Sequence, residues 1–163
     1  MKKFNFFLSL SLLVLFGCAS HSESSPIPQP PIYLYLTDEK NIPSAIRKFH
    51  DTRDLTTEEG KIDYLLGRVQ SSGLSFIRNR ETFPGPAAAA FLREKIGWYE
   101  GHFHVPIKTA DAFVAHVAKG STTTGLPYEV ILGNGKYENL QRVLRNELDA
   151  LNSCLEEFCY QSR

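Results

Sequence analysis

Proline and serine dominate the stretch from Ala19 to Pro31, and this composition limits where the chain can fold. Such a segment buries too little apolar surface to offset the entropy lost on ordering, and its prolines favour an extended polyproline II conformation. We therefore expect a tether at residues 18–31, long enough to reach roughly 40 Å at about 3.1 Å per residue. A Pro-rich partner motif is the alternative. In either case the globular fold must be built from the residues that follow.

An export signal precedes the tether. Residues 1–3 are basic at two positions, and residues 4–16 form a predominantly apolar run. The run is shorter than the about 20 apolar residues of a transmembrane helix and fits the core of a secretory signal. It ends in the letters LFGC at residues 15–18, which resemble the lipobox of bacterial lipoproteins. The resemblance implies removal of residues 1–17 and lipidation of Cys18; an ordinary secretory signal with an incidental cysteine is the alternative.

The lipobox resemblance also implies a location. Two or three acyl chains such as palmitate hold a protein on a lipid bilayer firmly, because each buried methylene contributes about 0.8 kcal/mol. Ala19 follows the cysteine at the position where lipoproteins retained in the inner membrane carry an aspartate. We therefore expect a lipid-anchored protein of the bacterial cell envelope, in the outer membrane and facing the periplasm.

The charge balance excludes one class of partner. The chain has 18 basic and 18 acidic side chains, and its formal net charge is zero. Proteins that bind nucleic acid rely on clustered lysine and arginine, and the sequence contains no such cluster. We therefore expect no nucleic-acid partner. Loss of Lys2 and Lys3 with the signal leaves residues 18–163 slightly acidic, and the sequence indicates no oligomeric state.

The apolar pattern predicts one small α+β domain in the order α-β-α-α-β-α, with helices packed on a short antiparallel sheet. We place it at residues 54–155. A connecting segment at residues 32–53 precedes it and includes a strand-like run at Ile32–Leu36 and a weak helical pattern at residues 44–50. A C-terminal tail at residues 156–163 follows.

Capping residues, helical periodicity and runs of strand formers locate the six elements. The first helix starts at a capping box formed by Thr56 and Glu59 and ends near Gly73, and a strand at Ser75–Arg78 follows it. Two helices come next, from Pro86 to Gly101 and from Thr109 to Gly120. A second strand at Tyr128–Leu132 precedes the last helix, which has on one face Leu140, Leu144, Leu148, Leu151 and Leu155.

Two cysteines follow Cys18, in a compartment where disulfides persist. Cys154 and Cys159 are five residues apart, which on an α-helix separates the side chains by about 140° and 7.5 Å. A disulfide between them requires the helix to fray after about Leu155, whereas Phe158 continues the apolar stripe. The bridge and the free thiols both remain open.

Metal binding and catalysis have weak support. His102 and His104 lie on the same side of an extended segment, a spacing that serves metal ligands, and His116 is the nearest third imidazole. No acidic residue accompanies them at a familiar spacing, so solvated loop histidines are the favoured interpretation. The sequence also contains no Gly-x-Ser-x-Gly motif, Walker loop, dinucleotide fingerprint or calcium loop. We assign no catalytic residue and expect no cofactor.

Polar residues gather at the ends of the two expected strands. Arg78 and Asn79 end the first strand, and a serine- and threonine-rich loop at residues 121–127 leads into the second at Tyr128. Antiparallel pairing brings these two groups together, whereas parallel pairing places them at opposite ends. Together they would form a cradle for a carboxylate or phosphate. The alternative is that they cap helices and satisfy the loop backbone.

The same stretches resemble a family of small secreted bacterial proteins of unknown function, the YfeK-like family, over Leu55–Leu151. The matching residues are Phe76, Arg78, Asn79, Leu92, Lys95, Ile107, Thr109, Ala110, Phe113, Ser121, Thr124, Gly125, Pro127, Tyr128 and Val130. Arg80 replaces a glycine of the family pattern, and Phe91 replaces a histidine, so a role that needs this imidazole is not implied. The resemblance implies the domain limits and periplasmic exposure but no activity.

These observations predict a non-catalytic binding or envelope-maintenance module. Its ligand is expected to be an anionic small molecule or an envelope component. A small envelope hydrolase, metal-assisted through His102 and His104, and a purely structural envelope protein are the alternatives. The binding hypothesis requires Arg78 and Ser121 to lie close together in the fold. The candidate ligand-binding residues are Arg78, Asn79, Lys95, Ser121, Thr124, Gly125 and Tyr128.

Overall fold

Helices and short strands alternate through residues 41–161, which the computed structural model describes together with residues 34–37. The expected signal, Cys18 and the tether lie outside the described residues. The helices are α1 (Ile42–His50), α2 (Glu58–Ser71), α3 (Gly85–Phe103), α4 (Ala110–Ala112), the π-helical turn η2 (Phe113–Val117) and α5 (Leu140–Gln161). The strands are β1 (Ser75–Arg78), β2 (Glu81–Pro84), β3 (Glu129–Ile131) and β4 (Tyr137–Asn139).

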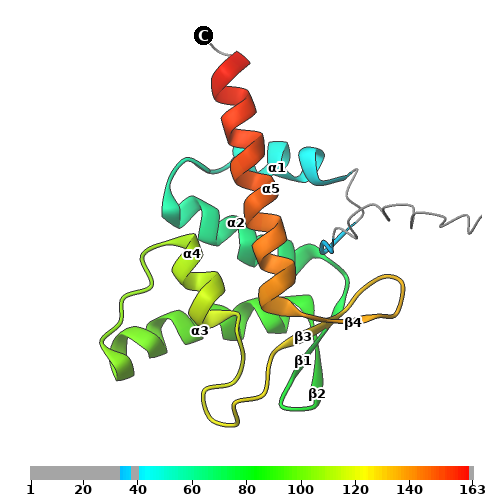
Figure 1. The fold of residues 1–163 in the computed structure, drawn as a ribbon, viewed down its shortest axis with the longest axis vertical. Coiled ribbons are helices and arrows are strands. Elements are labelled where there is room, and N and C mark those ends of the chain that lie inside the picture. The colour runs from blue at the N-terminus through cyan, green and yellow to red at the C-terminus, as the bar shows by residue number, and fades with distance from the viewer. Residues whose placement is uncertain (1–33, 38–40, 162–163) are drawn as a thin grey trace, which may run out of the picture. The chain divides into compact units, whose positions relative to one another are not determined.

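The four strands of the described residues form one antiparallel sheet in the order β2-β1-β3-β4 (Figure 1). Phe76 of β1 lies opposite Val130 of β3, and Ile77 lies opposite Glu129. Successive side chains of a strand point to opposite faces, and Phe76 and Val130 share the buried face. The α+β fold with an antiparallel sheet is therefore confirmed, including the antiparallel pairing of the two expected strands.

The core lies between the helices and this face of the sheet. Burial of a large apolar side chain contributes about 1.5–3 kcal/mol to the free energy of folding, and both the helices and the sheet supply such side chains to the core. Figure 1 shows α5 starting beside the sheet and extending beyond the rest of the fold at its C-terminal end. The largest fully buried side chains include Tyr64, Leu92, Phe113, Leu144 and Leu148.

A buried carboxylate joins three distant parts of the chain. Glu147 of α5 is fully buried, and Arg68 of α2 donates to it from Nε at 2.9 Å and from a terminal nitrogen at 3.1 Å. Tyr64 donates its hydroxyl to the same carboxylate at 3.2 Å, and burial raises the pKa of Tyr64 strongly. The backbone N–H of Leu36 donates to Glu147 at 2.9 Å. The first described residues are thus attached to the last helix.

Several local predictions are confirmed. The first expected strand has the predicted bounds, Ser75–Arg78. Gly73 has φ +68° just after α2, the left-handed conformation that glycine adopts at helix ends. Thr109 caps the next helical segment by accepting a hydrogen bond from the backbone N–H of Ala112 at 3.1 Å.

The start of α2 differs from the predicted capping box. Thr57, not Thr56, is the N-cap, and its hydroxyl accepts from the backbone N–H of Gly60 at 3.1 Å. The hydroxyl of Thr56 instead donates to Asp54 at 2.6 Å. The Thr56 side chain therefore belongs to the turn before the helix, because its hydrogen bond to Asp54 takes the place of a capping bond to the helix backbone.

The sequence patterns missed β2 and β4 and placed a strand where the described residues show none. Both missed strands pair at the edges of the sheet and contain no fully buried residue, and neither has an apolar run. Residues 34–36 of the strand-like run are not in the sheet. They are held on α5, since the side chain of Asn146 donates to the carbonyl of Leu34 at 3.0 Å. None of the helices in the described part of the chain is both long and apolar enough to span a bilayer.

Candidate anion-binding site

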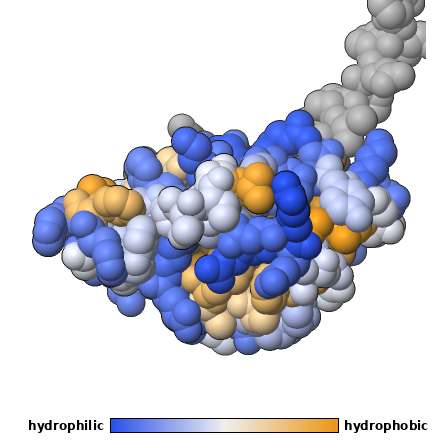
Figure 2. All heavy atoms as spheres, turned by 90° about the horizontal axis from the view of Figure 1, so that it is seen from below, coloured by the Kyte–Doolittle hydropathy of each residue, from blue (hydrophilic) through white to orange (hydrophobic). Residues whose placement is uncertain are grey.

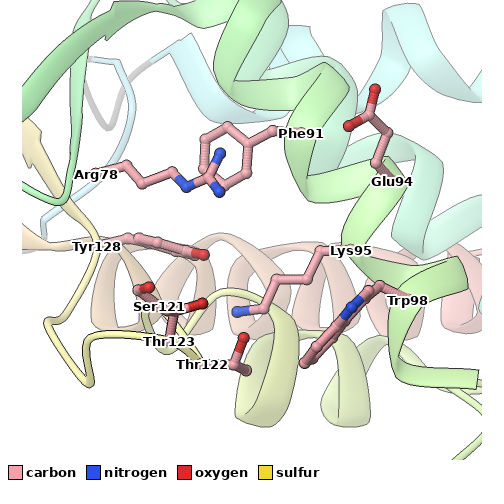
Figure 3. Close-up of a pocket in the computed structure, with 9 residues that line it drawn as sticks. All are labelled: Arg78, Phe91, Glu94, Lys95, Trp98, Ser121, Thr122, Thr123 and Tyr128. Carbon is pink, nitrogen blue, oxygen red and sulfur yellow. The ribbon is translucent and has the colours of Figure 1, made fainter. Parts of the chain in front are cut away.

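The antiparallel pairing of β1 with β3 places Arg78, at the end of β1, beside Tyr128, just before β3. Helix α3 passes this end of the sheet, and the loop that begins at Ser121 closes the other side (Figure 3). Together they enclose a pocket of about 320 Å³, within the range of small-molecule sites. Its lining residues are Arg78, Phe91, Glu94, Lys95, Trp98, Ser121, Thr122, Thr123 and Tyr128.

Arg78 has no anionic partner among the residues that the structure describes. Its guanidinium carbon lies 4.9 Å from the centre of the Phe91 ring, and its Nε atom is buried without a hydrogen bond. No ion pair or hydrogen bond within the described residues involves its side chain. A buried donor without a partner costs free energy, so native structures rarely leave one unless a ligand or water completes it. Other arginines of the domain do form ion pairs; these are Arg53, Arg68, Arg93, Arg142 and Arg145.

Lys95 is the second cation of the pocket. Its ammonium donates to the carbonyl of Val117 at 2.9 Å and to the carbonyl of Gly120, and it lies 4.6 Å from the centre of the Tyr128 ring. An ammonium has three donors, so one remains for a ligand. Burial, together with the positive charge of Arg78, lowers the pKa of Lys95 to about 8. The nitrogen lies between Tyr128 and Thr122 in Figure 3.

The hydroxyl-rich loop is held in one conformation by its own backbone. The N–H of Ser121 donates to the carbonyl of Leu126 at 2.8 Å, and the N–H of Gly125 donates to the carbonyl of Ser121 at 2.9 Å. Gly125 has φ +72°, which a residue with a side chain rarely adopts. The loop is joined to the β1–β2 turn, because the hydroxyl of Thr124 donates to the side-chain oxygen of Asn79 at 2.7 Å.

The chemistry of the pocket suits an anion. Arg78 and Lys95 bring two positive charges to one cavity, and the carboxylate of Glu94 forms no ion pair or hydrogen bond within the described residues. Figure 3 shows the Glu94 carboxylate directed away from Lys95 and the Tyr128 hydroxyl directed into the pocket. Burial raises the pKa of Tyr128, so this hydroxyl remains a donor. Seen from below relative to Figure 1, the surface mixes hydrophilic areas with smaller hydrophobic ones (Figure 2).

Residues 56–152 match a family of unknown function, DUF5329. The chain belongs to this family. No curated protein and no solved structure shows significant similarity to it. The expectation of membership in an uncharacterised family is thus confirmed, with limits close to the predicted Leu55–Leu151, whereas the YfeK-like resemblance remains a prediction.

The DUF5329 domain brings four of the predicted site residues together around the pocket. These are Arg78, Lys95, Ser121 and Tyr128. Asn79 and Thr124 bond to each other outside the pocket lining, and Gly125 shapes the loop. The requirement that Arg78 and Ser121 lie close together is met.

The sequence prediction missed several lining residues of the DUF5329 pocket. Phe91 and Trp98 lie four residues before and three residues after Lys95 on α3, so helical spacing places all three on one face. This spacing is a usable signal, but a helical stripe of large side chains is equally typical of a residue packed in the core. Thr122 and Thr123 lie in the predicted loop and belong to the pocket as well.

The histidines do not occupy the extended segment that was expected. His102 lies within α3 and stacks on Trp98 with 4.6 Å between ring centres, and His104 is the left-handed C-cap of that helix. The premise of a two-histidine metal spacing on an extended strand is therefore wrong. Within residues 34–37 and 41–161 the DUF5329 protein contains no group of three or more potential metal-ligating His, Cys, Asp or Glu side chains.

The cysteines of α5 remain on a continuous helix. The α5 backbone is helical through Gln161, without the fraying that a bridge requires. Cys154 is a half-buried free thiol, and burial raises its pKa. The side chain of Cys159 lies outside the described side chains.

Proposed function

We propose that this DUF5329 protein is a lipid-anchored protein of the bacterial cell envelope whose domain binds a small anion without catalysing a reaction. The observation that carries the proposal is the unpaired Arg78 in a pocket that also contains Lys95. A carboxylate or phosphate would supply charge-assisted hydrogen bonds to both cations, which are about twice as strong as neutral ones. The ligand thereby satisfies the donor that the protein leaves unsatisfied.

Binding without catalysis is favoured by the hydrogen bonds of the pocket hydroxyls. The Ser121 hydroxyl accepts from the backbone N–H of Thr124 at 3.3 Å, and no described residue forms a hydrogen-bonded nucleophile–base pair with it. A nucleophile must lie within hydrogen-bond reach of a base to be activated. We therefore assign the Ser121 hydroxyl to ligand contact.

Trp98 makes the proposal directly testable, because it is the single tryptophan of the chain and lines the pocket. Titration of the purified full chain with acetate is expected to change Trp98 fluorescence in a saturable manner. Inorganic phosphate is expected to behave likewise, whereas chloride at the same ionic strength should give no saturable change. A linear response to all three salts would contradict a specific anion site.

The affinity for acetate is expected to fall about tenfold between pH 7 and pH 9. The pKa of Lys95 is about 8, so its ammonium is charged below this pH and neutral above it. The contacts of the anion with Arg78 do not depend on Lys95, so binding weakens without being abolished. Acetate is the suitable probe because its own charge does not change in this interval. Fluorescence titrations at half-unit pH steps would measure the profile. An affinity for acetate that stays constant from pH 7 to pH 9 would show that Lys95 does not contribute to anion binding.

The lipid anchor is a separate expectation and rests on the sequence LFGC at residues 15–18. Cells that express the protein should incorporate radiolabelled palmitate into it, and Cys18→Ser should abolish the label. A Cys154→Ser variant is the matched control and should retain it. Fractionation of the membranes should place the labelled protein in the outer membrane. Equal labelling of the wild type and Cys18→Ser would rule out lipidation at this cysteine.

A further inference from the structure

The two ends of the pocket differ in chemistry. At one end the cations lie against aromatic rings, Arg78 over Phe91 and Lys95 over Tyr128. These two rings also contact each other edge to face, with 5.2 Å between their centres. They are therefore already occupied by the protein's own cations and serve to position them.

Trp98 forms the other end and carries no cation. His102 stacks on it at an interplanar angle of 25°, and Phe103 contacts it edge to face with 4.9 Å between ring centres. These contacts fix the orientation of the indole before any ligand arrives. A rigid aromatic side chain in a pocket offers a large apolar surface at little cost in conformational entropy.

Three polar residues also line the pocket that contains this indole. The hydroxyls of Thr122 and Thr123 and the carboxylate of Glu94 form no hydrogen bond or ion pair within the described residues, and all three residues line the pocket. Hydroxyls both donate and accept, whereas an ionised carboxylate only accepts. The combination therefore suits a ligand that carries several hydroxyl groups next to an apolar face.

We propose that the ligand is an acidic sugar, whose acid group binds between Arg78 and Lys95 and whose ring lies against Trp98. This inference rests on the proposed anion-binding function and adds the chemical class of the ligand. A sugar ring has an apolar face of C–H groups and an edge of hydroxyls. The apolar face of the sugar matches the indole of Trp98, and its hydroxyl groups match the polar side chains of Thr122, Thr123 and Glu94.

Five probes separate the parts of this proposal by isothermal titration calorimetry on the purified full chain. D-glucuronate and glucose 6-phosphate combine a sugar ring with a carboxylate or a phosphate, acetate and inorganic phosphate carry the acid group alone, and glucose carries the ring alone. We expect D-glucuronate to bind at least tenfold more tightly than acetate, and glucose 6-phosphate to bind at least tenfold more tightly than inorganic phosphate. Both compounds are called sugar acids below. Glucose alone should show no measurable binding. The stronger of the two sugar acids identifies the preferred acid group.

Trp98→Leu tests the stacking contact. The variant should lose about tenfold in affinity for the sugar acids and keep the wild-type affinity for acetate. Tyr137→Leu is the matched control, because Tyr137 is an exposed aromatic residue of β4 away from the pocket, and it should bind both as the wild type does. Circular dichroism shows whether each variant is folded. The double variant Thr122→Val and Thr123→Val provides a second test. It should also lose about tenfold in affinity for the sugar acids and keep the wild-type affinity for acetate.

The outcomes distinguish this inference from the proposed function. If acetate and glucuronate bind equally well, the sugar inference is overturned and the anion site stands. If no anion binds, both fail. Tighter binding of L-glutamate than of either sugar acid would also overturn the inference, because Glu94 would then be acting as a partner for an ammonium group.

Discussion

Glu147→Gln is expected to lower the free energy of unfolding by about 3–5 kcal/mol. The substitution leaves the buried Arg68 without its carboxylate partner, and removing one member of a buried ion pair is far more costly than removing both. It also weakens the hydrogen bonds from Tyr64 and from the backbone of Leu36. Since small domains have about 5–15 kcal/mol of stability in total, the variant should be close to unfolding. Urea denaturation followed by circular dichroism measures the difference.

Two further variants make this stability prediction specific. Glu138→Gln removes the carboxylate of the Arg142–Glu138 pair, whose arginine is largely exposed, and should cost less than about 1 kcal/mol. The double variant Arg68→Met and Glu147→Met removes both buried charges and should recover part of the loss, whereas the Tyr64 hydroxyl and the Leu36 N–H still lack their acceptor. A Glu147→Gln protein within 1 kcal/mol of the wild type would show that the buried cluster contributes little.

Arg78→Gln is expected to weaken the binding of acetate about 10- to 100-fold, since hydrogen bonds to charged groups contribute about 1.5–3 kcal/mol. The free energy of unfolding should change by no more than about 1 kcal/mol, because Arg78 has no ion pair and its contact with Phe91 is its main interaction. The pKa of Lys95 should rise, because the nearby positive charge that lowers it is removed. The pH at which acetate affinity falls should therefore move upward.

The controls for Arg78→Gln separate binding from structure. Arg142→Gln alters an arginine whose ion pair lies outside the pocket, and its acetate affinity should equal that of the wild type. Arg78→Lys retains the charge but loses the planar donor fork, so its affinity should be intermediate. Loss of stability by more than about 2 kcal/mol with unchanged acetate affinity would instead assign Arg78 a purely structural role.

The fold was largely predictable because its central elements have strong local signals. α5 carries a long apolar stripe at helical spacing, and β1 is a short run with two strand-forming residues that follows a glycine. The edge strands were not predictable, since Tyr137–Asn139 contains two polar residues and forms a strand only by pairing with β3. The burial of Glu147 was not predictable either, because a charged residue on a helix normally faces solvent. Its burial depends on Arg68, which is distant in the sequence.

The candidate site was predictable only as far as strand pairing allowed. Arg78 and Ser121 follow from the antiparallel alternative, whereas the roles of Phe91 and Trp98 required the position of α3 relative to the loop. An aromatic stripe on a helix has the same pattern whether it packs in a core or lines a cavity. In the β1–β2 turn Arg80 has φ +71°, a conformation that favours glycine, which is the residue that the YfeK-like pattern carries at this position.

The hydrogen bond from Leu36 to Glu147 has a consequence for biosynthesis. Its partners are 111 residues apart in the sequence, and the contact exists only after α5 has formed. The segment around Leu36 can therefore be held in place only after the last helix of the domain has been synthesised. A chain that ends before α5 lacks the carboxylate that Arg68, Tyr64 and the backbone of Leu36 share, so we expect it to fold incompletely and to expose apolar surface.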